Sequence, residues 1–170
     1  LATILEAMKS NTVLQMTFQS FSMQEAKTFL VEPYCVKMSA QRWYMLARNV
    51  DYNYLRLYSL DRMEDVKLTD AHFVLPKDFC AKEYFAEYFG IVLDESAPLQ
   101  RIVLRADKYH QHYMRTLPLH HSQKEIYACD DYADFELTLR PTYDFYMKLM
   151  SFGNMIKVLE PESLQEKIYK

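Results

Sequence analysis

The chain has 170 residues, half of them hydrophobic and a quarter charged, and a formal net charge of −3 at pH 7. This composition fits a folded protein of one large or two small domains, and it excludes a disordered chain or one that coats nucleic acid indiscriminately. No apolar run approaches the roughly 20 residues of a membrane-spanning helix, no signal peptide opens the chain, and three cysteines without a CxxC pair fit a reducing cytoplasm.

The first 75 residues read as one helix followed by short strands. Leu1, Ile4, Leu5 and Met8 recur at helical spacing, so the chain opens inside an amphipathic helix and is expected to be a piece of a longer protein. Alternation of apolar and polar residues predicts strands over 14–18, 28–34, 42–47 and 55–60, and a weaker one over 66–74. Pro33 is expected near the end of its strand, where a missing N–H costs least. This spacing predicts a small β-barrel within residues 1–75.

Residues 76–98 are expected to link two domains. Residues 77–89 read as a helix, and Gly90 is expected at its C-cap. The polar turn at 94–98 is where we place the domain boundary.

Residues 99–170 show an alternation of strands and helices. The predicted strands are 101–106, 123–128, 135–139 and 155–159, and the predicted helices are 107–116, 141–152 and 162–169. The order β-α-β-β-α-β is that of a ferredoxin-like domain. The expected fold class is therefore α+β, a small β-barrel followed by a ferredoxin-like βαββαβ domain.

Motifs for catalysis are missing. Two glycines cannot build a phosphate-cradling or dinucleotide-binding loop, and no GxSxG, HExxH or paired CxxC is present. The five histidines are expected to be structural rather than metal ligands, and the acidic clusters at 64–65 and 130–134 fall in predicted turns. We therefore expect that the protein is not an enzyme and binds neither a cofactor nor a metal. The alternative, a hydrolase or nuclease, would need a metal cluster or a nucleophile–base pair.

The only locally basic stretch is 37–62, which carries five basic and two acidic residues. Period two places Arg42 and Tyr44 on one face of their strand, and Arg56 and Tyr58 on one face of the next. If the strands pair, these faces could lie side by side and bind phosphate or carboxylate, with rings that stack on bases. The alternative is ordinary cross-strand packing, with arginine stems over aromatic rings on a solvated face.

Three segments resemble, in order, the motifs of the bacterial WYL domain. They are Val31-Glu32-Pro33-Tyr34, Arg42-Trp43-Tyr44-Met45 and the run from Arg56 to Met63, with Met45 in place of Leu and Tyr58 in place of Phe. The second half resembles the WCX extension that accompanies WYL domains. The matching segments are 119–123, 149–153 and 158–161, with His121 in place of a common proline.

The resemblance implies an Sm/SH3-like barrel (WYL) followed by a ferredoxin-like domain (WCX). It also implies a cytoplasmic, homodimeric bacterial transcriptional regulator, whose helix-turn-helix domain binds DNA and would precede Leu1. The WYL domain would sense an anionic effector, a nucleotide or single-stranded nucleic acid, and no membrane partner is expected. The alternative from another class is a purely structural dimerisation module without an effector.

The resemblance, read together with the basic faces, also suggests which residues touch the effector. Arg56 and Arg62 rank first, followed by Tyr44 and Arg42. The full set of expected ligand-binding residues is Arg42, Tyr44, Arg56, Tyr58, Arg62 and His120. Trp43 is expected to anchor the barrel core, and Asp61 to orient Arg62 or cap a turn.

Overall fold

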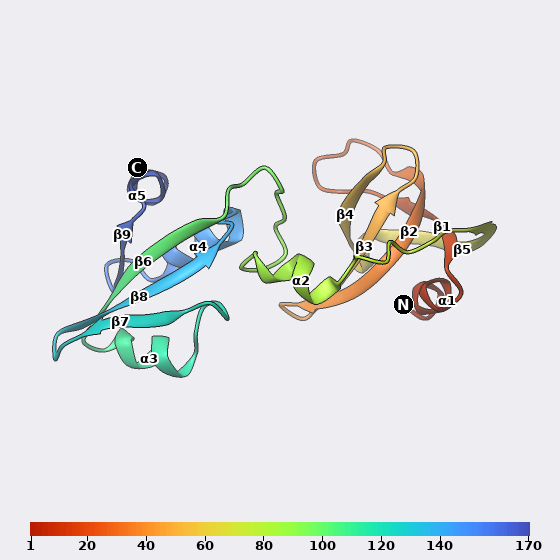
Figure 1. Ribbon diagram of the computed structural model, residues 1–170. Helices are drawn as coiled ribbons and strands as arrows, with labels where there is room; N and C mark the ends of the chain where they lie inside the picture. The colour runs from red at the N-terminus through yellow and green to blue at the C-terminus, as the bar shows by residue number, and fades with distance from the viewer. The chain divides into compact units, whose positions relative to one another are not determined.

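Residues 1–81 and 82–170 form two compact units in the computed structural model, which describes all 170 residues (Figure 1). Each unit combines one antiparallel sheet with helices, so the α+β fold class is confirmed. None of the helices is both long and apolar enough to cross a membrane.

The first unit is one helix followed by five strands. The helix α1 (Ala2–Ser10) ends where Asn11 takes a left-handed conformation and its N–H bonds the Ala7 carbonyl. The strands are β1 (Thr12–Phe18), β2 (Lys27–Ser39), β3 (Arg42–Asn49), β4 (Tyr54–Ser59) and β5 (Met63–His72), with the short 3-10 helix η1 (Leu60–Arg62) before β5. They form a sheet in the order β4-β3-β2-β1-β5. The predicted helix and all five predicted strands are present.

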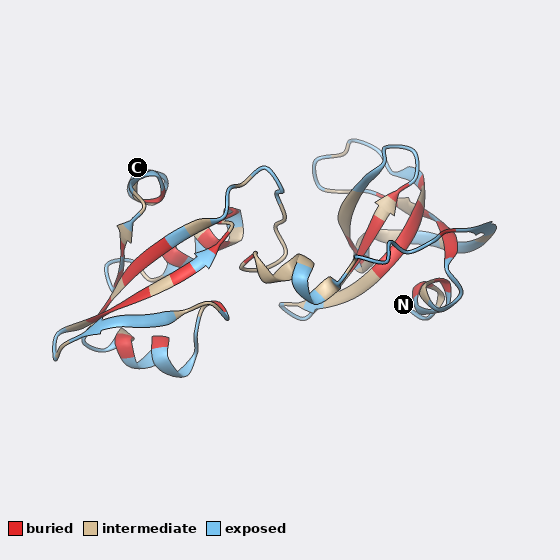
Figure 2. Cartoon of the chain, viewed as in Figure 1, coloured by how far each residue is buried: buried red, intermediate tan, exposed pale blue.

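Alternation along the strands builds the core of this unit. Leu14, Met16 and Phe18 of β1 are buried, while Gln15 between them is exposed. They pack with Ile4 and Ala7 of α1 and with inward residues of β2, β3 and β4, which are Phe29, Val31, Met45, Ala47 and Tyr58. Figure 2 shows buried positions gathered along these strands.

Pro33 lies in the interior of β2, and the prediction that it stands near the strand end is wrong. The register of β2 against β3 shifts between Pro33 and Cys35, as at a β-bulge. A bulge leaves one residue outside the regular ladder, so a proline without an N–H can be accommodated there. The strand continues to Ser39 beyond it.

Trp43 is 41% exposed, so the prediction that it anchors the core is wrong. It pairs with Met38, close to a two-residue turn in which Ala40 and Gln41 both have positive φ. Such a turn suits a tight hairpin, but these residues are not its usual Asn-Gly signal. The register therefore places Trp43 beyond the end of the core, which begins at Met45.

The helix α2 (Ala81–Ala86) is much shorter than the predicted 77–89, and Gly90 is not its C-cap. The chain leaves the helix at Glu87, whose carbonyl accepts a hydrogen bond from the Arg140 N–H, and Tyr88 forms a bridge with Arg140. Gly90 is required for space instead, because a Cβ there would collide with the Asp144 carboxylate.

The second unit has the predicted strand and helix order. Its strands are β6 (Gln100–Asp107), β7 (Lys124–Ala128), β8 (Tyr132–Leu139) and β9 (Ile156–Glu160), in the sheet order β7-β8-β6-β9. Its helices are α3 (His110–Thr116), α4 (Tyr143–Ser151) and α5 (Glu162–Tyr169). Buried residues of α3, α4 and α5 share one core with the inward residues of β6, β8 and β9.

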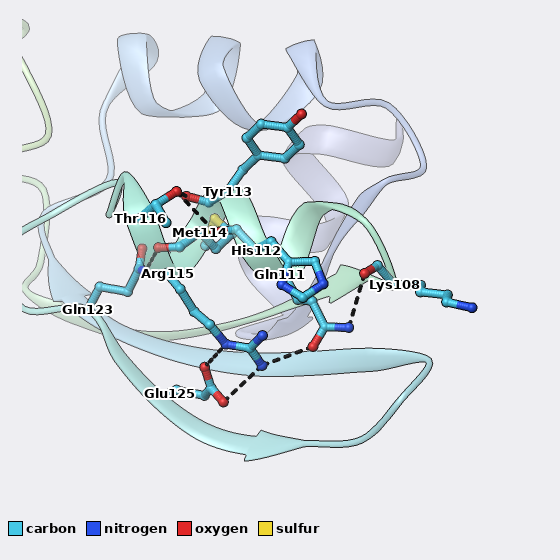
Figure 3. A network of polar contacts seen from close by, with 9 residues as sticks. All are labelled: Lys108, Gln111, His112, Tyr113, Met114, Arg115, Thr116, Gln123 and Glu125. Carbon is cyan, nitrogen blue, oxygen red and sulfur yellow. Dashed lines mark hydrogen bonds and ion pairs between the residues drawn. The ribbon is translucent and has the colours of Figure 1, made fainter.

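Side-chain hydrogen bonds tie the exposed strand β7 to α3 (Figure 3). Arg115 donates to the Glu125 carboxylate at 2.6 and 3.1 Å and to Gln111 at 2.9 Å. Gln123 donates to the Met114 carbonyl at 2.6 Å, where the helix has free carbonyl groups. Polar bridges therefore hold this edge strand, which buries no side chain of its own.

Candidate functional site

The register of β3 against β4 separates the two basic faces that were expected to lie side by side. Arg56 pairs with Ala47 and Tyr58 pairs with Met45. Directly opposed residues of neighbouring strands share one face of the sheet. Arg56 and Tyr58 therefore lie on the face of the sheet that carries the core residues of β3. Tyr44 lies on the opposite face, so the prediction that it stands beside Arg56 and Tyr58 is wrong.

Tyr58 belongs to the core rather than to the surface predicted for it. Its side chain is 0% exposed and packs edge-on against Phe18, with ring centroids 5.1 Å apart. Its hydroxyl accepts a hydrogen bond from the buried Asn49 amide at 3.3 Å, and burial raises the pKa of the phenol. A side chain with no exposed surface leaves a ligand nothing to touch.

Arg48 is the basic residue of the 37–62 stretch that is fully engaged within the protein. Its guanidinium donates two hydrogen bonds of 2.6 Å to the Glu32 carboxylate and a third to Asn53. Glu32 is 8% exposed, and bonding to it raises the pKa of Arg48. This forked pair is typical of structural support.

A hollow of about 430 Å³ opens beside the end of β1 and the loop 19–26. We call it the Phe18 hollow; its lining residues are Thr17, Phe18, Gln19, Ser20, Phe21, Met23, Ala26, Asp61, Arg62 and Glu64. Gln19 holds the loop by donating to the Met23 and Gln24 carbonyls at 3.2 Å. Phe21, at the loop tip, is 88% exposed. The Phe21 ring is therefore largely exposed to solvent.

Arg62 lies against this ring. Its guanidinium carbon is 4.3 Å from the Phe21 ring centroid and 5.8 Å from that of Phe18. Its Nε is buried and has no hydrogen-bond partner, and no carboxylate lies within ion-pair distance of the guanidinium. A buried, unsatisfied guanidinium N–H is unusual because it loses water without a replacement.

Arg56 joins the same aromatic group from β4. Its guanidinium carbon is 5.7 Å from the Phe18 ring centroid and 5.5 Å from that of Tyr58. Like Arg62, it forms no ion pair. Phe18 therefore has two arginines within cation–π distance, neither of them neutralised by a carboxylate.

Arg42 and Tyr44 lie further from this group. Arg42 contacts Asp61 at 3.8 Å, with both side chains more than half exposed. Tyr44 is half-buried and pairs with Ser59. Of the expected residues on these strands, the structure brings Arg56 and Arg62 together, and it connects Arg42 to the hollow through Asp61.

Two carboxylates also line the hollow. Asp61 accepts a short hydrogen bond from the Ser59 hydroxyl, which with Arg42 and Arg62 lowers the pKa of the carboxyl group. Glu64 stands at the start of β5. The hollow thus offers a guanidinium, an aromatic ring and two hydrogen-bond acceptors. This set suits a ligand with an anionic group, a flat ring and N–H donors.

Sequence reasoning missed Phe18 and Phe21. Phe18 has the alternation of a core residue, so nothing in the pattern distinguished it. Phe21 did carry a signal, because it is an apolar side chain within the polar loop Gln19-Ser20-Phe21-Ser22. Neither unit contains three or more His, Cys, Asp or Glu side chains grouped to hold a metal ion.

His120 is buried within the second unit, and both of its ring nitrogens are engaged. Its Nε2 lies 2.7 Å from the Ala86 carbonyl, and its Nδ1 lies 2.7 Å from the Ser122 hydroxyl. The His121 Nε2 lies 2.7 Å from the same carbonyl. Since Nε2 must donate to a carbonyl, Nδ1 acts as the acceptor. The structure gives His120 the role of fastening the end of α2 to the loop before β7.

Comparison with known proteins bears on the fold and the family. The chain is similar to the solved structure of proteasome accessory factor B/C (PafBC) of Arthrobacter aurescens, with 22% identity and a TM-score of 0.48 over 98% of this chain and 25% of that one. It is also similar to a CRISPR Cas-related protein, with 12% identity and a TM-score of 0.56 over 99% of this chain and 48% of that one. The chain thus spans less than half of either protein, and the likeness to the second, at 12% identity, shows the fold alone. No curated protein matches the sequence.

Models of two families match the chain. The WYL domain model matches residues 1–68, and the WCX domain model matches residues 98–170. The WYL match contains the Phe18 hollow and both unpaired arginines. The chain therefore belongs to the proteins that combine a WYL domain with a WCX domain.

Proposed function

We propose that the WYL domain is the sensing part of a bacterial transcriptional regulator and binds an anionic effector, a nucleotide or single-stranded nucleic acid, in the Phe18 hollow. The observation that carries this proposal is Arg62. Its guanidinium is stacked on an exposed ring, lacks a carboxylate partner and keeps an unsatisfied N–H. A phosphate would pair with the guanidinium through its Nη groups, and a base would extend the stack on Phe21.

The remaining parts of the effector fit the same hollow. Arg56 adds a second positive charge near Phe18, while Asp61 and Glu64 can accept hydrogen bonds from amino groups of a base. The acids disfavour a ligand that is only a cluster of negative charges, such as inorganic phosphate. This favours a nucleotide or an oligonucleotide over a simple anion.

We also propose a fold for each of the two domains and a cellular role for the protein. The first unit would be an Sm/SH3-like barrel within residues 1–75, and the second a ferredoxin-like domain within 99–170, joined by 76–98. The protein would act in the cytoplasm without catalysis, as a homodimer, with DNA bound by a domain outside these 170 residues. The strand order β7-β8-β6-β9 and the all-antiparallel pairing support the ferredoxin-like assignment.

One observation favours the alternative of a purely structural dimerisation module. Tyr109, Tyr113 and Leu117 recur every four residues over α3 and the two residues that flank it, and each is more than two-thirds exposed. Side chains at this spacing form one stripe on a helix. If this stripe were the sole functional surface, the chain would dimerise and bind no effector.

Titration with labelled oligothymidylate, oligoadenylate and mononucleotides tests the proposal. Because Arg62 and Arg56 are unpaired within the protein, Arg62→Gln should weaken binding about tenfold, and the double variant with Arg56→Gln should weaken it further. Arg101→Gln is the matched control, since Arg101 is exposed and already bound to Glu136 and Glu160. Absence of binding by the unmodified protein, or equal loss in the control, would contradict the proposal.

A further inference from the structure

The second unit contains a hollow of its own, of about 440 Å³. It lies between the segment 91–100, the start of α4 and one side of α5, and all its lining residues belong to residues 82–170. This volume is within the range of small-molecule sites in proteins. Nothing in the proposed effector site of the WYL domain accounts for it.

The loop that forms one wall of this hollow is held firmly. The Thr142 hydroxyl donates to the Val92 carbonyl at 2.8 Å, and the Asp144 carboxylate accepts hydrogen bonds from the Ile91 and Val92 N–H groups at 2.9 and 3.2 Å. Arg140 donates to the Ala97 carbonyl at 2.6 Å. The wall is therefore fixed in place before any ligand arrives, which lowers the entropic cost of binding.

The ammonium of Lys167 is the positive charge in the hollow. It donates to the Tyr146 hydroxyl at 3.1 Å and stands 5.1 Å from that ring's centroid, and it has no carboxylate partner. All four arginines of this unit, in contrast, bond carboxylates. An ammonium has three donors, so Lys167 keeps donors for a ligand carboxylate.

Asp94 supplies the opposite charge. Its Oδ1 accepts hydrogen bonds from the Ser96 N–H and hydroxyl at 2.9 and 2.5 Å, and these bonds lower the pKa of the carboxyl group. No lysine, arginine or histidine lies within ion-pair distance of it. The rest of the lining combines the apolar and aromatic residues Val92, Ala97, Pro98, Pro141, Tyr143, Tyr146 and Leu164 with the polar residues Ser96, Gln100, Thr142 and Ser163.

From these features we infer that the hollow binds a free α-amino acid with an apolar or aromatic side chain. Lys167 would bind its carboxylate, Asp94 its ammonium, and the apolar lining its side chain. The Asp94 carboxylate would repel a dianionic phosphate, and the Lys167 ammonium would repel a cation that has no carboxylate. The inference is independent of the effector site in the WYL domain.

Calorimetric titration of the whole chain with L-leucine and L-phenylalanine tests this inference. We expect saturable binding of at least one, and clearly weaker binding of isocaproate, which lacks the ammonium, and of isoamylamine, which lacks the carboxylate. Lys167→Met should weaken amino-acid binding about tenfold. Asp94→Asn should remove most of the preference for the amino acid over isocaproate.

Two controls separate this site from the rest of the molecule. Lys157→Met removes an exposed lysine outside the hollow and should leave amino-acid binding unchanged, and so should Arg62→Gln in the WYL domain. Amide NMR shifts should confirm that Lys167→Met is folded and should place the ligand near Val92, Tyr146 and Lys167. No binding of either amino acid, or binding that Lys167→Met does not weaken, would overturn the inference.

Discussion

The two domains differ in how completely their arginines are paired with carboxylates. In the WCX domain Arg101, Arg105, Arg115 and Arg140 each bond a carboxylate. In the WYL domain Arg56 and Arg62 lie against phenylalanine rings and bond none. An arginine neutralised within the protein stabilises the fold, whereas one left unpaired over an exposed ring is available to an external anion. Whether an arginine bonds a carboxylate within the protein is thus a better guide to its function than its positive charge alone.

The largest effect on stability is expected at Arg48, which resembles the arginines of the WCX domain although it lies in the WYL domain. Arg48→Ala leaves the Glu32 carboxylate buried without its partner, so the free energy of unfolding should fall by about 2–4 kcal/mol. Chemical unfolding followed by the fluorescence of Trp43, which lies in this domain, measures the change.

Arg101→Ala is the control for this change. Arg101 is about half exposed, and the variant should cost less than about 1 kcal/mol because exposed ion pairs contribute little. Equal losses in the two variants would show that burial does not distinguish these pairs.

A smaller effect, dependent on pH, is expected at His120. Burial, and then the neighbouring His121, lower the pKa of the imidazole below its ordinary value of 6.5. The unfolded chain therefore binds a proton more readily than the folded one, and stability is lost as the pH falls from about 6.5 through the lowered pKa. The loss should be up to about 1.4 kcal/mol per pH unit within that window.

Urea unfolding followed by circular dichroism between neutral and acidic pH checks this behaviour. His120→Gln should flatten the dependence, while His112→Gln, a change at an exposed position of α3, should leave it as it is. If His120→Gln kept the full dependence on pH, the loss would have to come from other groups.

The smallest effect on stability is expected at Tyr58. Tyr58→Phe removes only the hydroxyl that accepts the Asn49 hydrogen bond at 3.3 Å, and should cost about 1 kcal/mol or less. Effector affinity should not change, because the side chain is fully buried. A marked loss of affinity in a folded Tyr58→Phe variant would show that this core position opens to the ligand.

Most elements of the fold could be predicted from local patterns. Alternation at Leu14, Met16 and Phe18, and helical spacing from Leu1 to Met8, reflect burial of one face and are visible in the sequence. The ends of elements were harder, because they depend on distant contacts. The helix α2 stops short where Arg140 bonds the Glu87 carbonyl, some fifty residues along the chain.

The candidate site was predicted only in part. Arg56 and Arg62 were expected. The face of the sheet on which Tyr58 lies, however, depends on the register of β4 against β3, which no local pattern reveals. A shift by one residue moves a side chain to the other face. Trp43 was misplaced for the same reason, since the hairpin turn that puts it outside the core has no Asn-Gly signal. Phe21 needed the folded loop to show that it lies on Arg62.

The dependence of effector binding on salt tests the role of the unpaired arginines most directly. Binding of a roughly ten-nucleotide oligothymidylate, within the usual range of site sizes, would be measured at several salt concentrations for the unmodified protein, Arg62→Gln and Arg101→Gln. If Arg62 neutralises a phosphate, Arg62→Gln should reduce the slope of log affinity against log salt by about 0.7, and Arg101→Gln should leave it unchanged. Identical slopes for the unmodified protein and Arg62→Gln would contradict the assignment of Arg62 as the anion-binding residue.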